Sequence, residues 1–455
     1  MRPEYYFTTK PPQILRYALT GAGGGFARTL LMQTLRIDHL KPAILCDLDV
    51  PRLKALCLEL GYPAESLITC EDADAISAGR PDQILLVNDI SLINFATFDI
   101  LVEATGSPSA GYRAAQATLA AKRHVAMVSK EVEAVAGVAL ARDAARQGVV
   151  YSPADGDQPS NLIGWVARAR ALGFDIIAAG KSSEYDLVFD EATGEVTQLD
   201  ARFAAPELAD LMTLGDDIQA TLAARRKAMR GRITSATADY CEMSVVATHT
   251  GLIADRESLH YPIARTTELA DIYALREDGG VLARSGVIDV FNMLRRPDEA
   301  SFAGGVFVVV RTSDAQSWAL LAQKGHVVSR NGRYACLYLP YHFMGVETPI
   351  TLFEAVWHGR PTGSAHPTQC VVLAGRAMEP LKAGSVLHMG GHHHDVAGVR
   401  AVLLERETTD PTIAPLYLAA NATLARDVAA GELITLNHLK NMDPALLAAW
   451  HSGLA

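Results

Sequence analysis

Short apolar runs alternate with amphipathic segments along the first 150 residues. Apolar runs of strand length stand at residues 15–20, 42–46, 98–106 and 124–129. Segments with helical spacing stand between or after them, at residues 27–35, 110–121 and 137–147. Strands that alternate with helices indicate a parallel, doubly wound sheet, which binds ligands at the carboxyl ends of its strands. The predicted fold class of this part is therefore α/β.

A glycine-rich turn follows the first predicted strand. Its residues are Gly21, Ala22, Gly23, Gly24, Gly25 and Phe26. Glycine suits this position because the backbone must turn tightly and approach a pyrophosphate, whose charge is met by backbone amides and the helix N-terminus. Phe26 stands where the Gly-x-Gly-x-x-Gly pattern has its third glycine. We predict that Gly21, Ala22, Gly23, Gly25 and Phe26 contact a dinucleotide cofactor.

Asp47 stands at the end of the second predicted strand. An acid at this position can accept hydrogen bonds from a ribose diol, and its charge would disfavour the 2′-phosphate of NADP. The alternative is that Asp47 or Asp49 caps the helix that begins near Pro51. NAD is therefore the predicted cofactor, with NADP as the alternative because Arg52 and Lys54 are close in sequence.

Two later strand ends carry further candidates. Thr105 and Gly106 follow the predicted strand that begins at residue 98, and Lys130 follows the strand at residues 124–129. Because ligands of a doubly wound sheet lie at the carboxyl ends of its strands, we expect these three residues to face the nicotinamide.

The segment from residue 148 to residue 186 carries the candidate chemistry. A predicted strand at 148–152 opens into Asp155-Gly156-Asp157 before a helix at 161–172, and an apolar strand from residue 175 ends at Lys181. A cation at the end of a buried strand is costly unless it is paired. We interpret Lys181 as a donor to a substrate carbonyl and Asp157 as a group that orients it or accepts a proton. The alternatives are a structural ion pair for Lys181 and turn or cap chemistry for Asp155 and Asp157.

Several of these segments together resemble a known family. They are the run from Asp99 to Gly106, Ser129-Lys130-Glu131, Asp155-Gly-Asp-Gln-Pro159, Ala179-Gly-Lys181, Gly279 to Gly286, Pro340-Tyr-His342 and Glu347-Thr-Pro349. The chain resembles the homoserine dehydrogenase-like oxidoreductases that carry a C-terminal SAF domain, and among these the 1-deoxy-D-xylulose 5-phosphate reductoisomerase-like enzymes. The resemblance implies a nicotinamide-binding domain, a central catalytic α/β domain and a homo-oligomer.

The predicted division has three domains. They are a Rossmann dinucleotide-binding domain at residues 1–152, a central α/β catalytic and oligomerisation domain at 153–366, and a small β-rich SAF-like domain at 367–455. The last contains a weak internal repeat, because residues 380–387 resemble residues 427–434. The acid-rich substrate segment of authentic homoserine dehydrogenases is absent, which favours a different substrate.

Other polar clusters have plainer interpretations. Arg225, Arg226, Lys227 and Arg230 predict a solvated helix face, with a substrate phosphate or an acidic partner subunit as the alternative. His342 is expected to bond to the backbone or to reach the catalytic cleft. The run His392–His394 predicts an exposed loop, because consecutive strand residues point to opposite faces, and metal binding is its alternative. No metal ligand is assigned.

Composition excludes several classes of protein. Asp and Glu exceed Lys and Arg by 51 to 41, and a net charge of −10 disfavours nucleic acid as a partner. The longest apolar runs fall short of the roughly 20 residues that span a bilayer. The N-terminus lacks the apolar core of a secretory signal, and the six cysteines lack a Cys-x-x-Cys pair. We therefore predict no membrane partner, a cytoplasmic location and reduced, buried thiols, against structural zinc or disulfides.

These observations predict an NAD(P)-dependent oxidoreductase. It would transfer hydride to or from a small polyhydroxylated compound that carries a phosphate or a carboxylate. In one interpretation, isomerisation of the substrate accompanies the hydride transfer. Lys181 is the first catalytic candidate, followed by Lys130, Asp157 and Asp155. The alternatives are homoserine dehydrogenase proper and a non-catalytic, dinucleotide-responsive sugar-binding protein.

Overall fold

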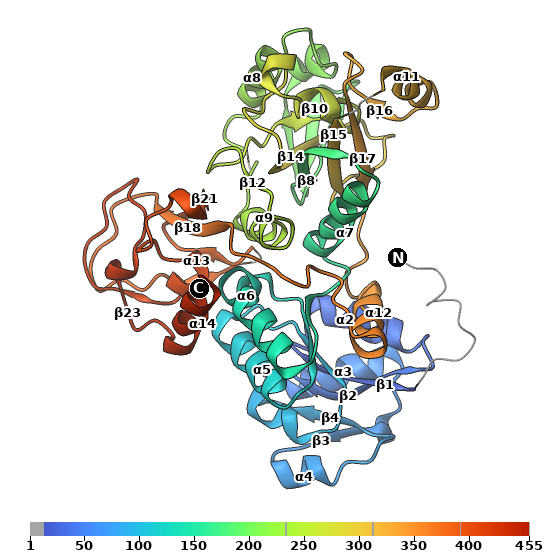
Figure 1. Ribbon diagram of the computed structural model, residues 1–455, viewed down its shortest axis with the longest axis vertical. Helices are drawn as coiled ribbons and strands as arrows, with labels where there is room; N and C mark the ends of the chain where they lie inside the picture. Colours follow the sequence, from blue (N-terminus) through green and yellow to red (C-terminus); the bar gives the residue numbers. More distant parts are fainter. Residues whose placement is uncertain (1–12, 233, 312–313, 392, 455) are drawn as a thin grey trace. The chain divides into compact units, whose positions relative to one another are not determined.

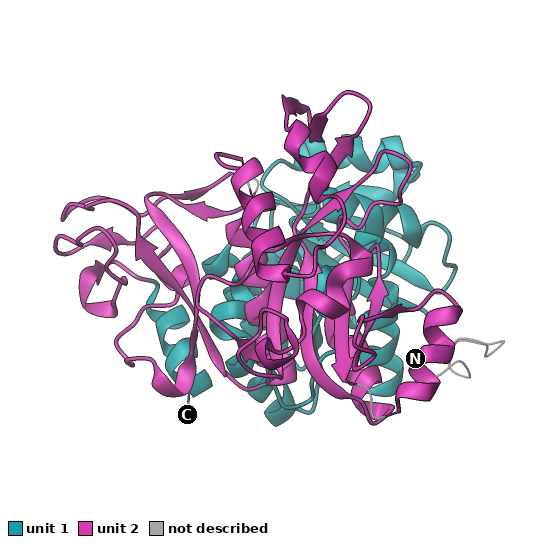
Figure 2. Cartoon of the chain, turned by 90° about the horizontal axis from the view of Figure 1, so that it is seen from above, with its two compact units in different colours: residues 1–160, 343–367, 443–455 teal, residues 161–342, 368–442 magenta. Residues whose placement is uncertain are grey.

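The computed structural model describes residues 13–232, 234–311, 314–391 and 393–454. The chain forms two compact units, coloured separately in Figure 2. The N-terminal unit comprises residues 1–160, 343–367 and 443–455, and the second unit comprises residues 161–342 and 368–442. This division differs from the three predicted segments, because residues 343–367 and 443–455 belong to the N-terminal unit and residues 368–442 to the second unit.

The N-terminal unit contains a seven-stranded parallel sheet, which confirms the predicted doubly wound fold (Figure 1). Its strands are β1 (Leu15–Thr20), β2 (Leu40–Cys46), β3 (Leu67–Thr69), β4 (Ile84–Val87), β5 (Ile100–Glu103), β6 (His124–Met127) and β7 (Tyr151–Pro153). Their order is β3-β4-β2-β1-β5-β6-β7. β2, β3 and β4 therefore lie on one side of β1, and β5, β6 and β7 lie on the other. The point between β1 and β5 where the strand order switches is where such sheets form a ligand crevice.

Helices cover both faces of this sheet. They are α2 (Gly25–Thr34), α3 (Val50–Leu60), α4 (Ala73–Ser77), α5 (Pro108–Ala120), α6 (Lys130–Gln147), α12 (Pro349–His358) and α14 (Pro444–Leu454). α2 and α12 contribute to one apolar core with β1 and β2, whereas α5, α6 and α14 pack on one another. α6 begins at Lys130, seven residues before the predicted start. The prediction missed this first turn because it contains the polar residues Glu131 and Glu133, which the fold buries.

The second unit is built on a mixed ten-stranded sheet. Its main path runs β11 (Ala201–Ala204), β10 (Glu195–Gln198), β9 (Leu187–Asp190), β14 (Val287–Arg295), β8 (Asp175–Ser182), β15 (Val306–Arg311), β17 (Tyr334–Leu339) and β16 (Val327–Val328), and β12 (Ile253–Ala254) and β13 (Ile263–Ala264) pair with β14. Its helices are α7 (Gln158–Ala171), α8 (Ile218–Ala228), α9 (Thr237–Thr250), α10 (Leu269–Ile272) and α11 (Ala315–Gln323). The connection between β15 and β17 contains α11, whose apolar side places Trp318 in a buried position.

The C-terminal tail of the second unit is β-rich, as predicted. Its paired strands are β18 (Val371–Ala377) with β21 (Val399–Glu405), β19 (Met389–Gly390) with β20 (Asp395–Val396), and β22 (Thr423–Leu424) with β23 (Leu439–Lys440), and a short helix, α13 (Leu416–Ala419), joins them. α9 packs against β14 on one side and against β18 and β21 on another. Every residue of α9 except Ala238 is consequently buried.

Two of the plainer predictions need correction or refinement. Arg225 is fully buried and forms a two-pronged ion pair with Glu268, so it does not belong to a solvated face; Arg226, Lys227 and Arg230 do remain exposed. His342 bonds to the backbone, with 2.9 Å between Nδ1 and the Gly304 carbonyl oxygen.

The remaining sequence interpretations concern cysteines, histidines and apolar helices. The six cysteines, all within the described residues, are thiols rather than disulfides, and five of them are buried. His393 is half-buried, with 3.0 Å between its Nδ1 and Glu184 Oε2. His392 lies outside the described residues. No group of His, Cys, Asp and Glu within the described ranges has the arrangement of a metal site. Among the helices of those ranges, none combines the length and apolar character needed to cross a membrane.

Candidate active site

The candidate cofactor residues meet at one edge of the N-terminal sheet. Because the strands are parallel, their carboxyl ends all reach this edge. The residues that follow these ends are Gly21 after β1, Asp47 after β2, Thr105 and Gly106 after β5, Lys130 after β6, and Asp155 after β7. The structure thus brings together the predicted cofactor residues and three of the four catalytic candidates. Lys181, the fourth, belongs to the second unit.

The glycine turn has the shape that a diphosphate requires. Gly21 has a φ of +62°, and a Cβ at this position would lie 2.2 Å from the Ala104 carbonyl oxygen at the end of β5. A side chain is therefore excluded at the switch point. Gly24 is the N-cap of α2, and a Cβ on Gly25 would meet nothing within 4 Å in the described chain. The amides of Ala22, Gly23 and Gly24 donate within the protein, so the part of the turn that fits an anion is the N-terminus of α2.

Asp47 is held against this turn. Its Oδ2 accepts a hydrogen bond from the Gly23 amide at 2.8 Å, and its Oδ1 accepts one from the Asp49 amide at 3.1 Å. A carboxylate has about four acceptor positions, so lone pairs remain for ribose hydroxyls. The capping alternative is correct for Asp49, whose Oδ1 accepts from the Arg52 amide at 3.0 Å.

A hollow of about 380 Å³ opens beside the turn. It is lined by Gly23, Gly24, Gly25, Arg28, Arg52, Ala55, Leu56 and Glu59. Arg28 is ion-paired with Glu59 at 2.7 Å, whereas the Arg52 side chain contributes an exposed cation. The glycine cradle, the Asp47 carboxylate and this hollow together fit a dinucleotide.

A distant segment packs closely against α2. Phe26 occupies the position that the usual pattern gives to glycine, and Gly345 approaches the backbone of α2 beside it. A Cβ on Gly345 would lie 2.6 Å from the Phe26 carbonyl oxygen, and its amide donates to Thr29 Oγ1 at 2.9 Å. Sequence reasoning missed Gly345 because it lies more than 300 residues from the turn.

A buried acid fixes the residues that follow β5. Glu103 is fully buried, and its Oε1 accepts hydrogen bonds from the Thr105 hydroxyl at 2.6 Å and from the Thr105 amide at 3.0 Å. Burial raises the pKa of Glu103, although these hydrogen bonds oppose the shift. The Gly106 amide donates to Ser129 Oγ at 2.8 Å, which ties the ends of β5 and β6 together beside Lys130.

The turn after β7 is held by threonines from residues 343–367. The Asp155 amide donates to Thr351 Oγ1 at 2.8 Å, and Thr348 Oγ1 donates to the Asp155 carbonyl oxygen at 2.9 Å. Ser160 Oγ donates to Asp155 Oδ1 at 2.7 Å. Burial raises the pKa of Asp155 to about 6, against the lowering effect of the Ser160 and Thr351 hydrogen bonds. A carboxyl group with this pKa can exchange protons near neutral pH.

Lys181 lies between two acids on α9. Its Nζ donates to Asp239 Oδ1 at 2.7 Å and to Glu242, and the three side chains are 2%, 1% and 4% exposed. The two acids are three residues apart, which places them on one face of a helix. Sequence reasoning missed this partnership because the two acids lie 58 and 61 residues from Lys181 in the chain. The ion-pair alternative for Lys181 is therefore present in the structure.

A strained loop adds a hydroxyl to this cluster. Tyr261 donates to Asp239 Oδ2 at 3.1 Å, and Leu259 and Tyr261 have φ values of +51° and +46°. A left-handed conformation costs a non-glycine residue about 1–3 kcal/mol and persists where neighbouring contacts enforce it. Asp289 supplies such a contact, because its carboxylate accepts from the His260 amide at 3.0 Å.

Comparisons with known proteins associate part of the chain with an oxidoreductase family. Residues 156–348 match the family model described as oxidoreductase DRL, catalytic domain. A comparison with curated proteins found no match.

Three solved structures have distant similarity to this chain. A probable dehydrogenase from Thermotoga maritima is 14% identical, with 76% of this chain and 90% of that chain covered and a TM-score of 0.38. A DOX-P reductoisomerase with fosmidomycin and magnesium is 16% identical, with 52% and 58% covered and a TM-score of 0.32. Myo-inositol 2-dehydrogenase from Lactobacillus plantarum is 13% identical, with 77% and 91% covered and a TM-score of 0.35. The fold assignment rests on the strand order of the chain itself.

Proposed function

We propose that the protein is a nicotinamide dinucleotide-dependent oxidoreductase. The observation that carries this proposal is the Asp47 carboxylate bonded to the Gly23 amide, at the edge where the glycine turn meets the start of α2. This arrangement presents a ribose acceptor beside a diphosphate cradle. The match of residues 156–348 to an oxidoreductase catalytic domain supports the same class.

The bound dinucleotide would supply a hydride acceptor or donor, and the chain would supply binding, orientation and charge. The glycine turn and α2 would bind the diphosphate, and Asp47 would bind the adenosine ribose. Thr105, Gly106 and Lys130 would face the nicotinamide. NAD is the proposed cofactor, with NADP as the alternative because Arg52 lines the adjoining hollow.

Lys181 is the proposed stabiliser of charge on the reacting oxygen. Asp239 and Glu242 compensate its charge and fix the position of Nζ, so the cation needs little reorganisation when charge develops. Asp155 and Asp157 are the proposed proton-transfer groups, and the pKa of about 6 for Asp155 suits that role.

The proposed substrate is a small polyhydroxylated compound that carries a carboxylate or phosphate. We further propose that reduction of the substrate is coupled to its isomerisation, because the chain resembles reductoisomerase-like enzymes. The same resemblance leads us to propose a homo-oligomer and a SAF-like tail. Size-exclusion chromatography with light scattering tests the first of these, and a monomer would contradict it.

A deuterium-transfer experiment tests the proposed reaction. The full chain is incubated with NADH or NADPH deuterated at the reactive carbon and with a panel of carboxylated and phosphorylated hydroxyketones. Mass spectrometry then detects deuterium in the product. Transfer to at least one compound, lost in Lys181→Met, is expected. Saturable cofactor binding without transfer to any compound would favour the non-catalytic, dinucleotide-responsive alternative.

A further inference from the structure

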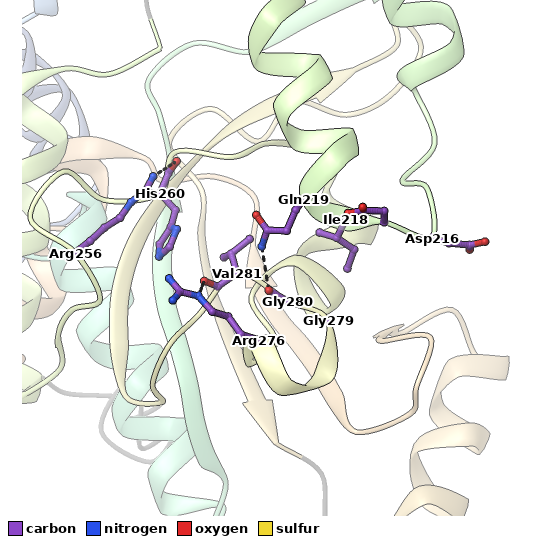
Figure 3. A pocket seen from close by; sticks show the side chains of 10 residues that line it. Asp216, Ile218, Gln219, Arg256, His260, Arg276, Gly279, Gly280 and Val281 are labelled. Carbon is purple, nitrogen blue, oxygen red and sulfur yellow. Dashed lines mark hydrogen bonds between the residues drawn. The ribbon is translucent and has the colours of Figure 1, made fainter.

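A second cavity lies in the second unit and belongs to no element of the dinucleotide site. It has a volume of about 540 Å³. It is lined by Asp216, Asp217, Ile218, Gln219, Arg256, His260, Arg276, Gly279, Gly280 and Val281 (Figure 3). A space of this size accommodates a small organic molecule.

Arg256 is fixed at one end of the cavity by the strained loop. Its Nε donates to the Leu259 carbonyl oxygen at 2.7 Å, and its Nη2 donates to the His260 carbonyl oxygen at 3.2 Å. The positive φ values of Leu259 and Tyr261 give the loop the curvature that turns these carbonyl groups toward the guanidinium. The Arg256 side chain is therefore oriented before any ligand arrives.

Arg276 is fixed in the middle of the cavity by a glycine turn. Its Nε donates to the Val281 carbonyl oxygen at 3.1 Å, and Gln219 Nε2 donates to the Gly280 carbonyl oxygen at 3.1 Å. Gly280 is required here, because a Cβ would lie 2.0 Å from the Ala274 carbonyl oxygen. Figure 3 shows Arg256 and Arg276 on the same side of the space, with Val281 and Gln219 beside them.

The acids around the cavity have other partners. His260 Nε2 lies 2.8 Å from Asp255 Oδ2, and Asp217 caps α8 by accepting from the Ala220 amide. Asp216 Oδ1 lies 3.9 Å from Arg330 Nη1. Figure 3 shows Asp216 at the opposite end of the cavity, pointing away from Arg256 and Arg276. The arginine end of the cavity is thus positive. The wall uses Nε and Nη2 of Arg256 and Nε of Arg276, and each guanidinium has further N–H donors.

We propose that this cavity binds the oxyanion group of a small molecule, a carboxylate or a phosphate, between Arg256 and Arg276. Guanidinium groups held in place by a wall recognise such groups through paired, charge-assisted hydrogen bonds. The cavity is also connected to the Lys181 cluster, because His260 lines it and the next residue, Tyr261, donates to Asp239. Identifying this oxyanion with the acidic group of the substrate rests on the proposed function.

The test is a binding titration of the full chain with inorganic phosphate and, separately, with acetate. Calorimetry or ³¹P line broadening gives the affinity for the parent, Arg256→Gln, Arg276→Gln and the control Arg230→Gln, which removes an exposed arginine outside the cavity. We expect the parent to bind at least one probe, each cavity variant to lose about tenfold or more in affinity, and the control to match the parent. Thermal unfolding checks that both variants fold; both arginines are exposed, so no core is disturbed.

Two results would overturn the inference. One is a parent that binds neither probe at concentrations of about 10 mM, which corresponds to an interaction of less than about 3 kcal/mol. The other is binding that persists in both cavity variants, as phosphate held at the glycine turn would do. NADH binding is measured on the same samples. Phosphate binding without NADH binding would contradict the proposed function alone, and the reverse would contradict this inference alone.

Discussion

Lys181 and Asp239 form a buried ion pair in the second unit, with 2.7 Å between Nζ and Oδ1 and exposures of 2% and 1%. Glu242 contacts the same Nζ from the next turn of α9. Removing one partner of a buried cluster leaves uncompensated charge, which costs about 3–5 kcal/mol. The cluster therefore links the stability of the second unit to the chemistry proposed for Lys181.

Lys181→Met is expected to impair both stability and hydride transfer. The variant keeps most of the side-chain length but leaves two carboxylates unpaired, so the free energy of unfolding should fall by about 3–5 kcal/mol. Loss of a preorganised donor should slow the chemical step by about 10²–10³. Cofactor affinity should change little. Single-turnover kinetics at saturating cofactor, at a temperature where the variant is folded, measures the chemical step.

The control for this variant is Lys227→Met, which removes an exposed lysine of α8. It should match the parent in stability and rate. A Lys181→Met protein that is destabilised but transfers hydride at the parent rate would leave Lys181 a purely structural residue, and Lys130 would become the first candidate.

Asp47→Ala should remove the preference for NAD. The carboxylate at the end of β2 would accept ribose hydroxyls in NAD and repel the 2′-phosphate of NADP. We expect the parent to bind NAD about tenfold more tightly, a difference of about 1.4 kcal/mol. Arg52→Gln should widen that difference by weakening NADP. Fluorescence titration of the parent and both variants with both reduced cofactors measures all six affinities, and NADP binding to the parent as tightly as NAD would refute the assignment.

Asp155→Asn should change how stability depends on pH. Because the folded state raises the pKa of Asp155 from 3.8 to about 6, the folded protein holds this proton at pH values where the unfolded chain has lost it. The parent therefore loses stability as pH rises through that window, by up to about 3 kcal/mol. The asparagine variant is neutral throughout. Its stability relative to the parent should be similar at pH 4 and greater at pH 7.

Urea unfolding at several pH values measures this difference. Asp38→Asn, which changes an exposed acid, is the control and should show a pH dependence close to that of the parent. A stability difference between Asp155→Asn and the parent that stays constant with pH would mean that Asp155 does not titrate in this window.

Packing of the tail should matter for stability but not for cofactor affinity. Leu373 lies in β18, which packs on α9, and is 2% exposed. Leu373→Ala should lower the free energy of unfolding by about 2–5 kcal/mol. NADH affinity should be unchanged, because the residues proposed to bind the dinucleotide belong to the N-terminal unit. Leu320→Ala, at an exposed position, is the control. A Leu373→Ala variant that loses NADH affinity as well as stability would contradict the independence of cofactor binding from the packing of the tail.

Local features of the sequence predicted the N-terminal unit well. The glycine turn, Asp47 and the strand ends depend on residues close in sequence, and hydrophobic periodicity located β1, β2, β5, β6 and β7 of the doubly wound sheet but not β3 or β4. The residues from distant segments that hold the site in place could not be found from local sequence. Gly345 and Thr351 reach the site only through long-range packing, and both are ordinary residues in their own segment. The i, i+3 pair Asp239 and Glu242 was a readable signal, but nothing local joined it to Lys181.

Equilibrium binding of NADH tests directly whether the glycine turn holds a dinucleotide. The parent, Gly21→Ala and Gly164→Ala are titrated and followed by nicotinamide fluorescence. A Cβ at Gly21 would lie 2.2 Å from the Ala104 carbonyl oxygen, whereas one at Gly164 would meet nothing within 4 Å of the described chain. We predict saturable binding to the parent and to Gly164→Ala, and a loss of about tenfold or more in Gly21→Ala. A parent that binds neither NADH nor NADPH, or a Gly21→Ala variant that binds as tightly as the parent, would contradict the account.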